Sequence, residues 1–115
     1  MLFVCYTKCS TCKKARKFLE ERGVAMEVRD VKEQPPTAEE LRTWWKKSGL
    51  PLKRLFNTSG QQYRALGLSA RLPDMSEEEQ LALLASDGML VKRPILVTED
   101  AVLVGFRQED WEKLL

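Results

Sequence analysis

The feature that most restricts the fold is a pair of cysteines, Cys9 and Cys12, between an apolar run and a helical pattern. The run LFVCY (residues 2–6) is short and continuously apolar, which is typical of a strand buried on both faces. The residues after it repeat at helical spacing, and Gly23 suits the left-handed conformation that often ends a helix. The expected buried face of this helix consists of Cys12, Ala15, Phe18 and Leu19.

A second strand is predicted directly after this helix, at residues 24–31. In this stretch Val24, Met26 and Val28 alternate with more polar residues, which is typical of an edge strand with one solvated face. A strand, a helix and a strand within about 30 residues form a βαβ unit, and its two strands are parallel with a right-handed connection.

The middle of the chain carries two capping boxes, Thr37 with Glu40 and Ser76 with Glu79, each of which predicts the start of a helix. A turn and a short helix are expected between them, at residues 57–68. The side chains expected to face inward from the two capped helices are Leu41, Trp44, Trp45, Leu81, Leu83 and Leu84. Residues 36–88 are therefore predicted to be helical.

The last quarter of the sequence predicts a hairpin at residues 92–106, with its turn at TEDA, and then a helix that turns Trp111, Leu114 and Leu115 inward. The whole pattern indicates an α/β protein with a four-stranded mixed sheet, flanking helices and a helical insert between the second and third strands. We expect one domain over residues 1–115, with residues 1–30 and 90–115 as its core and residues 36–88 as the insert.

Composition excludes several functional classes. The chain of 115 residues has 43% hydrophobic residues and no apolar stretch near the roughly 20 residues that span a bilayer. It shows no signal-peptide pattern, and its net charge of +2 is too small to indicate a nucleic-acid binder. The absence of histidine excludes mechanisms that need a histidine base. We therefore expect a cytoplasmic monomer that contacts neither a membrane nor nucleic acid directly.

The cysteine pair predicts a reactive thiol. Cys9 falls where the first helix begins, and unpaired backbone N–H groups at a helix start favour a thiolate. Lys8 and Lys13 add positive charge nearby, which also lowers a cysteine pKa. Cys12 lies one turn further along, within reach of a disulfide, so we assign Cys9 as the attacking thiolate and Cys12 as the resolving thiol.

Two other interpretations of the cysteines stay open. A zinc half-site would need more ligands, but Cys5 belongs to the first strand and the chain has no other cysteine and no histidine. Two inert, buried thiols are the second alternative, because cysteine is among the most buried residue types. The redox interpretation is favoured, because CxxC between the strand and helix of a βαβ unit is a fairly specific signal. We expect no metal and no bound cofactor.

Pro94 is the second indication of function, since proline in a sheet is restricted to a strand start or an edge. A cis bond before Pro94 would direct the preceding residue toward the cysteine turn. Arg93 would then place a permanent planar cation beside the thiolate, suited to a carboxylate or an oxyanion. The alternative is a proline that only begins the strand, next to a solvated arginine.

The strand–CxxC–helix start, the helical insert, KRPILVT and the closing strand and helix resemble the arsenate reductase-like (ArsC/Spx) branch of the thioredoxin superfamily. This resemblance covers nearly the full chain and is closest to uncharacterised members, for which glutathione is a possible co-substrate. It implies a thioredoxin-like fold with Pro94 in cis, Cys9 as the nucleophile and Arg93 as the anion-binding residue.

Two departures from the family pattern bear on the substrate. Asn57 occupies the position where arsenate reductases of this branch carry a further arginine. We expect Asn57 to offer the substrate a neutral donor, and Arg64 is the candidate to replace the lost cation. A doubly charged oxyanion needs several charge-assisted donors, so this loss argues against arsenate. The complete CxxC, in contrast, favours a disulfide cycle within the chain itself.

Three functional hypotheses follow. The first is a thiol–disulfide oxidoreductase, reduced by glutathione, glutaredoxin or thioredoxin, that acts on a small oxyanion or a thiol-containing substrate. The second is a glutaredoxin-dependent arsenate reductase. The third is an Spx-like redox-sensing regulator that binds RNA polymerase through the insert, whose exposed cations are expected at Lys46, Lys47, Lys53 and Arg54.

Overall fold

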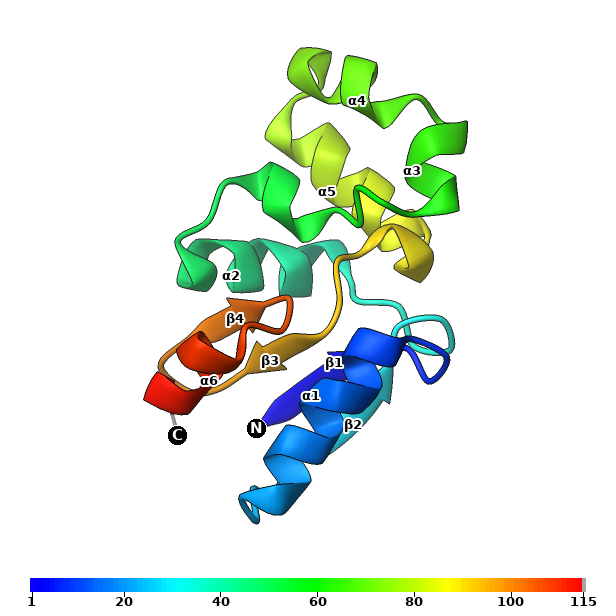
Figure 1. The fold of residues 1–115 in the computed structure, drawn as a ribbon. Helices are drawn as coiled ribbons and strands as arrows, with labels where there is room; N and C mark the ends of the chain where they lie inside the picture. The colour runs from blue at the N-terminus through cyan, green and yellow to red at the C-terminus, as the bar shows by residue number, and fades with distance from the viewer. Residues whose placement is uncertain (115) are drawn as a thin grey trace.

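Four strands form one mixed sheet in the order β2–β1–β3–β4 in the computed structural model, which describes residues 1–114 (Figure 1). The strands are β1 (Leu2–Cys5), β2 (Glu27–Asp30), β3 (Ile95–Val97) and β4 (Val102–Val104). β1 is central, parallel to β2 and antiparallel to β3, and β3 pairs with β4 as a hairpin. The predicted sheet is confirmed, whereas the inward orientation expected of Leu115 lies outside the described residues.

Helices follow the strands as the sequence predicts, and the longest insertion lies between β2 and β3 (Figure 1). The α-helices are α1 (Ser10–Glu21), α2 (Ala38–Ser48), α3 (Gln61–Ala65), α4 (Leu68–Arg71), α5 (Glu77–Ser86) and α6 (Gln108–Leu114). The described residues also form three short 3-10 helices, η1 (Leu52–Leu55), η2 (Leu72–Asp74) and η3 (Gly88–Leu90). No helix within residues 1–114 has the length and apolarity that crossing a bilayer requires.

The sheet is covered on both faces, because alternate residues of its central strands point to opposite sides. Phe3 and Leu96 join a buried cluster with α1 and with Trp111 of α6. Val4 and Ile95 point the other way, into a larger cluster with α2 and the rest of the insert. This arrangement, with a cis peptide bond between Arg93 and Pro94, is a thioredoxin-like fold, as predicted.

Local sequence signals set the helix ends in the insert. Both capping boxes are present, with Thr37 accepting from the Glu40 amide and Ser76 from the Glu79 amide. At the other end of α2, Gly49 has a φ of 70°, a left-handed conformation that glycine adopts without steric cost. Both tryptophans were expected to face inward; Trp44 is buried, whereas Trp45 is partly exposed.

The predicted second strand was wrong in its extent and in one of its buried positions. β2 begins at Glu27, and Val28 is 40% exposed, although its alternation with polar neighbours predicted burial. Arg29 is half-buried instead, because its guanidinium forms two hydrogen bonds with the Glu40 carboxylate of α2, at 2.6 and 2.8 Å. A tertiary ion pair thus reverses the pattern that hydrophobicity alone would set.

The insert is joined to the sheet by the segment that leads into β3. Phe56 and Val91 form an antiparallel bridge, with the Lys92 amide donating to the Leu55 carbonyl at 2.7 Å. Gly88 lies against the end of β2, and a Cβ built at this position would lie 1.8 Å from the Val31 carbonyl oxygen. The chain therefore approaches Arg93 along a path fixed by backbone contacts.

Candidate active site

Cys9 is placed by the turn that joins β1 to α1. Its amide donates to the Tyr6 carbonyl at 3.0 Å, and its backbone (φ −87°, ψ 122°) is extended, as is usual for the residue that precedes a helix. The Cys9 side chain is partly exposed, whereas Cys12, one turn into α1, is buried. The three thiols at positions 5, 9 and 12 are free.

The surroundings of Cys9 favour its thiolate. Partial burial opposes ionisation, but the N–H and the thiol of Cys12 together with the Arg93 guanidinium outweigh it and lower the pKa of Cys9 below the usual value. The mechanism expected from the helix start therefore applies, since the Cys12 N–H is one of the first amides of α1.

Cys12 and Cys5 show the opposite behaviour. Burial raises the pKa of Cys12 to about 12, despite the amide of Tyr6, which donates to the Cys12 sulfur at 3.4 Å. Burial also raises the pKa of Cys5, which lies in the cluster between α1 and the sheet and was predicted to be a packing residue. The two members of CxxC thus differ in the way that an attacking and a resolving thiol require.

Arg93 supplies the cation of the site. It precedes cis-Pro94, and its guanidinium lies over the Tyr6 ring, 4.9 Å from the ring centroid. Its Nε and Nη1 atoms are buried, yet they have no hydrogen-bond partner within residues 1–114. Buried polar groups are nearly always paired, so two free donors on one guanidinium indicate a place for an acceptor such as a carboxylate or an oxyanion.

The predicted lysines contribute less directly than the helix start. Lys8 and Lys13 are exposed, and neither forms an ion pair within the described part of the chain. The groups that lower the pKa of Cys9 are those of Cys12 and Arg93. The lysines therefore surround the site as solvated charges.

Asn57 and Arg64, the two candidates from the insert, form no hydrogen bond with Arg93 within residues 1–114. The backbone N–H of Asn57 donates to the carbonyl of Leu90 at 2.7 Å, and Leu90 lies three residues before Arg93 in the chain. The side-chain oxygen of Asn57 accepts from the Ser59 hydroxyl at 3.3 Å. Arg64 is exposed on α3, and it has no hydrogen bond or ion pair from its side chain among residues 1–114. Cys9, Cys12, Arg93 and Pro94 thus form the compact part of the predicted site.

Tyr6 is the residue of this site that sequence reasoning missed. Its ring lies under the Arg93 guanidinium, its amide donates to Cys12 and its carbonyl accepts from Cys9. The available signal was its position as the last, amphipathic residue of an otherwise apolar strand, just before the cysteine turn.

Comparison with known proteins identifies the family of this chain. The profile of the ArsC family matches residues 5–114. The chain belongs to the ArsC family. A crystal structure of an ArsC family related protein from Bacteroides fragilis has a TM-score of 0.96 and 55% identity, covering 99% of this chain and 96% of the other. The predicted family is therefore confirmed.

Named ArsC relatives fall into different functional groups. YusI of Bacillus subtilis, an uncharacterised protein, is 51% identical over 98% of this chain and 96% of its own length. An arsenate reductase of Neisseria meningitidis serogroup A is 32% identical, covering 94% of this chain and 92% of its own. The global transcriptional regulator Spx of Enterococcus faecalis is 24% identical, covering 93% and 80%. Family membership alone therefore does not select one activity.

Proposed function

We propose that this ArsC-family chain is a thiol–disulfide oxidoreductase in which Cys9 attacks, Cys12 resolves and Arg93 binds an anionic group of the substrate. The observation that carries the proposal is the pair of free, buried donors on Arg93, beside a thiol whose pKa is lowered. A substrate with a carboxylate near its disulfide, such as a glutathione mixed disulfide, fits this combination.

The reaction has two exchange steps. The Cys9 thiolate attacks one sulfur of the substrate disulfide, a bond forms to Cys9, and the other sulfur leaves as a thiolate. Cys12 then loses its proton to solvent and attacks the Cys9 sulfur, which releases the second thiolate and leaves a Cys9–Cys12 disulfide. Two electrons pass from the chain to the substrate, and two glutathione molecules, or the dithiol of a glutaredoxin or thioredoxin, reduce the chain again.

The difference between the two thiols supports this order. Cys9 is accessible and ionises readily, so it is the sulfur that an external disulfide meets. Burial raises the pKa of Cys12 to about 12, so this thiol stays protonated at neutral pH; the mixed disulfide on Cys9 then removes the smaller, additional contribution of the Cys9 charge. Cys12 therefore does not react with disulfides in solution before Cys9 has formed the mixed disulfide.

The test is turnover of two mixed disulfides of one peptide, one with glutathione and one with cysteamine, which carries an ammonium and no carboxylate, measured with glutathione and glutathione reductase. Cys9→Ser is expected to abolish turnover of both. Arg93→Met is expected to lower kcat/KM for the glutathione form by about 10- to 100-fold, the contribution of a charged hydrogen bond, with a smaller effect on the cysteamine form.

The matched controls are Lys13→Met, which removes an exposed cation near Cys9, and Cys12→Ser. Lys13→Met should leave the preference between the two disulfides unchanged. Cys12→Ser should accumulate a mixed disulfide on Cys9, visible by mass spectrometry. Equal losses for both substrates in Arg93→Met, or turnover by Cys9→Ser, would refute the proposal.

Arsenate reduction is the second candidate, supported by the 32% identity to the Neisseria arsenate reductase. In this reaction Cys9 would attack arsenate, and glutathione with glutaredoxin would supply the electrons. The single guanidinium beside Cys9 is the argument against it, because a doubly charged oxyanion calls for more donors. A glutaredoxin-coupled assay with arsenate, compared with Cys9→Ser, decides between the two substrates.

Redox sensing is the remaining candidate, supported by the identity to Spx. The Cys9–Cys12 disulfide would then act as a switch, and the insert, with its exposed Lys46 and Arg54, would contact RNA polymerase. Capture of RNA polymerase by only one of the reduced and oxidised forms would favour this function over turnover.

A further inference from the structure

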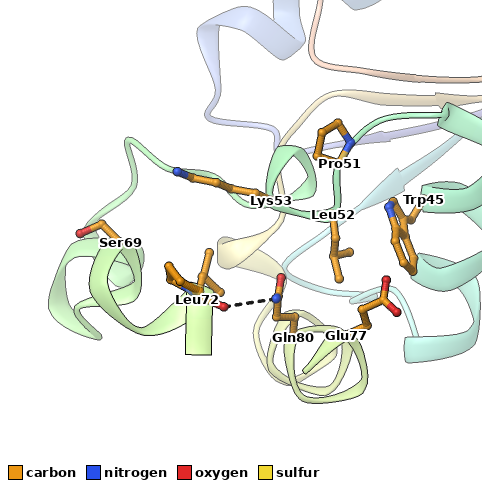
Figure 2. A pocket seen from close by; sticks show the side chains of 9 residues that line it. Trp45, Pro51, Leu52, Lys53, Ser69, Leu72, Glu77 and Gln80 are labelled. Atoms are coloured by element: carbon orange, nitrogen blue, oxygen red, sulfur yellow. Dashed lines mark hydrogen bonds between the residues drawn. The ribbon is translucent and has the colours of Figure 1, made fainter. Parts of the chain in front are cut away.

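The insert contains a cavity of about 460 Å³ that the proposed chemistry does not use. It lies between the end of α2, η1, the segment from α4 to η2, and the start of α5 (Figure 2). Its floor is apolar: Leu52 lies in the middle, with the Trp45 indole on one side and Leu72 on the other. A volume of this size, apolar with a few polar groups, is characteristic of ligand sites.

The Trp45 wall is fixed in place. Its Nε1 donates to the Leu50 carbonyl at 2.9 Å, and the hydroxyl of Ser48 holds the same turn by donating to the Trp45 carbonyl at 2.7 Å. Pro51 and Pro73 add two further rigid apolar surfaces at the rim. A ligand would therefore meet a preformed aromatic surface at low entropic cost.

One hydrogen-bond acceptor is directed into the cavity. The Gln80 Nε2 donates to the carbonyls of Leu72 and Met75, at 3.4 and 3.2 Å, so its Oε1 faces the other way. Figure 2 shows this oxygen on the side toward Leu52. An occupant therefore needs an N–H donor at its centre.

The rim carries one charge of each sign. Lys53 and Glu77 both line the cavity, both are exposed, and neither forms an ion pair within the described residues. Figure 2 shows the Lys53 ammonium and the Glu77 carboxylate on opposite sides of the apolar floor. A complementary occupant has an acidic group at one end and a basic group at the other.

We propose that this cavity is a docking site for a short peptide segment of a partner protein in which an apolar side chain lies between a basic and an acidic residue. The apolar side chain packs on Trp45 and Leu72, a backbone N–H donates to Gln80, and the flanking charges meet Glu77 and Lys53. A purely apolar ligand would leave Gln80 and both charges without a partner.

The probe is the acetylated and amidated tripeptide Lys-Leu-Asp, added to the full-length 15N-labelled chain. The readout is the indole N–H signal of Trp45, assigned with Trp45→Phe. Trp111 is the internal reference, because it is fully buried and donates to the Gly105 carbonyl, away from the cavity. The Trp45 signal is expected to shift saturably, with the Trp111 signal unchanged.

Charge variants test the complementarity. Lys53→Glu and Glu77→Lys are each expected to weaken binding about fivefold, as loss of an exposed ion pair predicts, whereas the matched control Lys46→Glu should leave it unchanged. Lys46 is exposed on the same helix as Trp45 and does not line the cavity. The Trp111 signal reports in every variant that the fold is intact.

Four outcomes would overturn the proposal. These are no shift of Trp45, equal binding of the neutral tripeptide Gln-Leu-Asn, equal weakening by Lys46→Glu, and a Trp45 shift that follows protein concentration without peptide, which would mean that a second copy of the chain covers the cavity. None of them depends on thiol chemistry, because Cys9→Ser can be titrated in the same way. Failure here is therefore distinct from failure of the proposed function.

Discussion

At the scale of single residues, two cysteines three positions apart have opposite tendencies to ionise. Their sequence context differs little, and the difference arises from depth, because Cys12 points into the cluster under α1 while Cys9 stays at the helix start beside Arg93. The difference in pKa between the two cysteines of CxxC therefore depends on the contacts that the fold provides to each sulfur.

The first prediction concerns the alkylation of Cys9 by iodoacetamide as a function of pH. The wild-type profile should have its midpoint below that of an ordinary thiol, because the pKa of Cys9 is lowered by Cys12 and Arg93. Arg93→Met should move the midpoint upward and slow alkylation at pH 6 several-fold. Arg93→Lys should retain part of the effect, since it keeps the charge.

Lys13→Met serves as the control in this experiment, because it removes a cation that is exposed. Peptide mapping should find the label on Cys9 alone at neutral pH, since burial raises the pKa of both Cys5 and Cys12. An unchanged profile in Arg93→Met would show that the guanidinium does not act on the sulfur.

The sequence predicts Cys9, Cys12, Arg93 and Pro94 as the site because each belongs to a local pattern with a known physical cause. It assigned too much to Lys8 and Lys13, because proximity in sequence does not show where a long side chain is solvated. It missed Tyr6, whose three contacts all depend on how the turn after β1 folds back.

At the scale of elements, β2 and α2 are connected by one partly buried ion pair. The Arg29 guanidinium contacts both oxygens of Glu40, and the Glu40 carboxylate also accepts from the Thr37 amide in the capping box of α2. One carboxylate thus begins a helix and holds a strand against it. Arg29 holds the pKa of Glu40 at about 2.

The second prediction is an acid-dependent loss of stability that depends on Glu40. The folded pKa is lowered, so the stabilisation is present above the ordinary pKa of glutamate and is lost as the pH falls toward about 2. Since the pair is partly exposed, we expect about 1–2 kcal/mol to be lost between about pH 5 and pH 2. Urea unfolding at a series of pH values measures it.

Glu40→Gln is the informative variant, because glutamine still completes a capping box but cannot titrate. Its free energy of unfolding should depend less on pH over this range than that of the wild type. Glu78→Gln is the matched control, since Glu78 pairs with Arg42 but is 74% exposed. Parallel pH curves for wild type and Glu40→Gln would contradict the assignment.

The elements with strong local signals were predicted well. Both capped helices and the hairpin appear where the sequence predicts them, because caps, turns and apolar period act over a few residues. Val28 was assigned to the wrong environment, because an edge strand is defined partly by what packs on it. The short helices η1, η2 and η3 left no periodic signal, since three or four residues are too few.

At the scale of the whole molecule, one of the contacts between the insert and the sheet is a close backbone approach at Gly88. Gly88 is buried, and its position leaves no room for a side chain before the Val31 carbonyl. The Val31 carbonyl cannot move away from Gly88 without disturbing the core, because Val31 is itself buried directly after β2. The close approach of Gly88 to Val31 therefore requires glycine at position 88, because any other residue would place a Cβ in this space.

The third prediction is that Gly88→Ala destabilises the protein by about 1–3 kcal/mol, the usual cost of forcing a methyl group into packed surroundings. Gly60→Ala is the matched control. A Cβ at Gly60 would meet the Asn57 side chain, which can move, and the Asn57 carbonyl oxygen at 3.3 Å, a far less severe approach than at Gly88, and the φ of −79° at Gly60 suits alanine. Urea unfolding should show a loss only for Gly88→Ala, and equal stability of the two variants would contradict the packing argument.

The connection between insert and sheet could not be predicted from the sequence. Residue 88 was predicted only as the end of the insert, and the bridge between Phe56 and Val91 joins residues that are far apart in the chain. Helix ends are local events, whereas such contacts form only after the chain has folded around them. The cavity beside Trp45 is unpredictable for the same reason, since five separate elements enclose it.

The bridge between Phe56 and Val91 has one more consequence. The segment that contains Arg93 is positioned by the insert before it and by β3 after it. Cys9, in contrast, is positioned by β1 and α1. Substitutions in the insert helices can therefore shift the Arg93 guanidinium relative to the Cys9 sulfur without contacting either group. Members of one family can in this way diverge in the anions that they accept while keeping an identical cysteine turn.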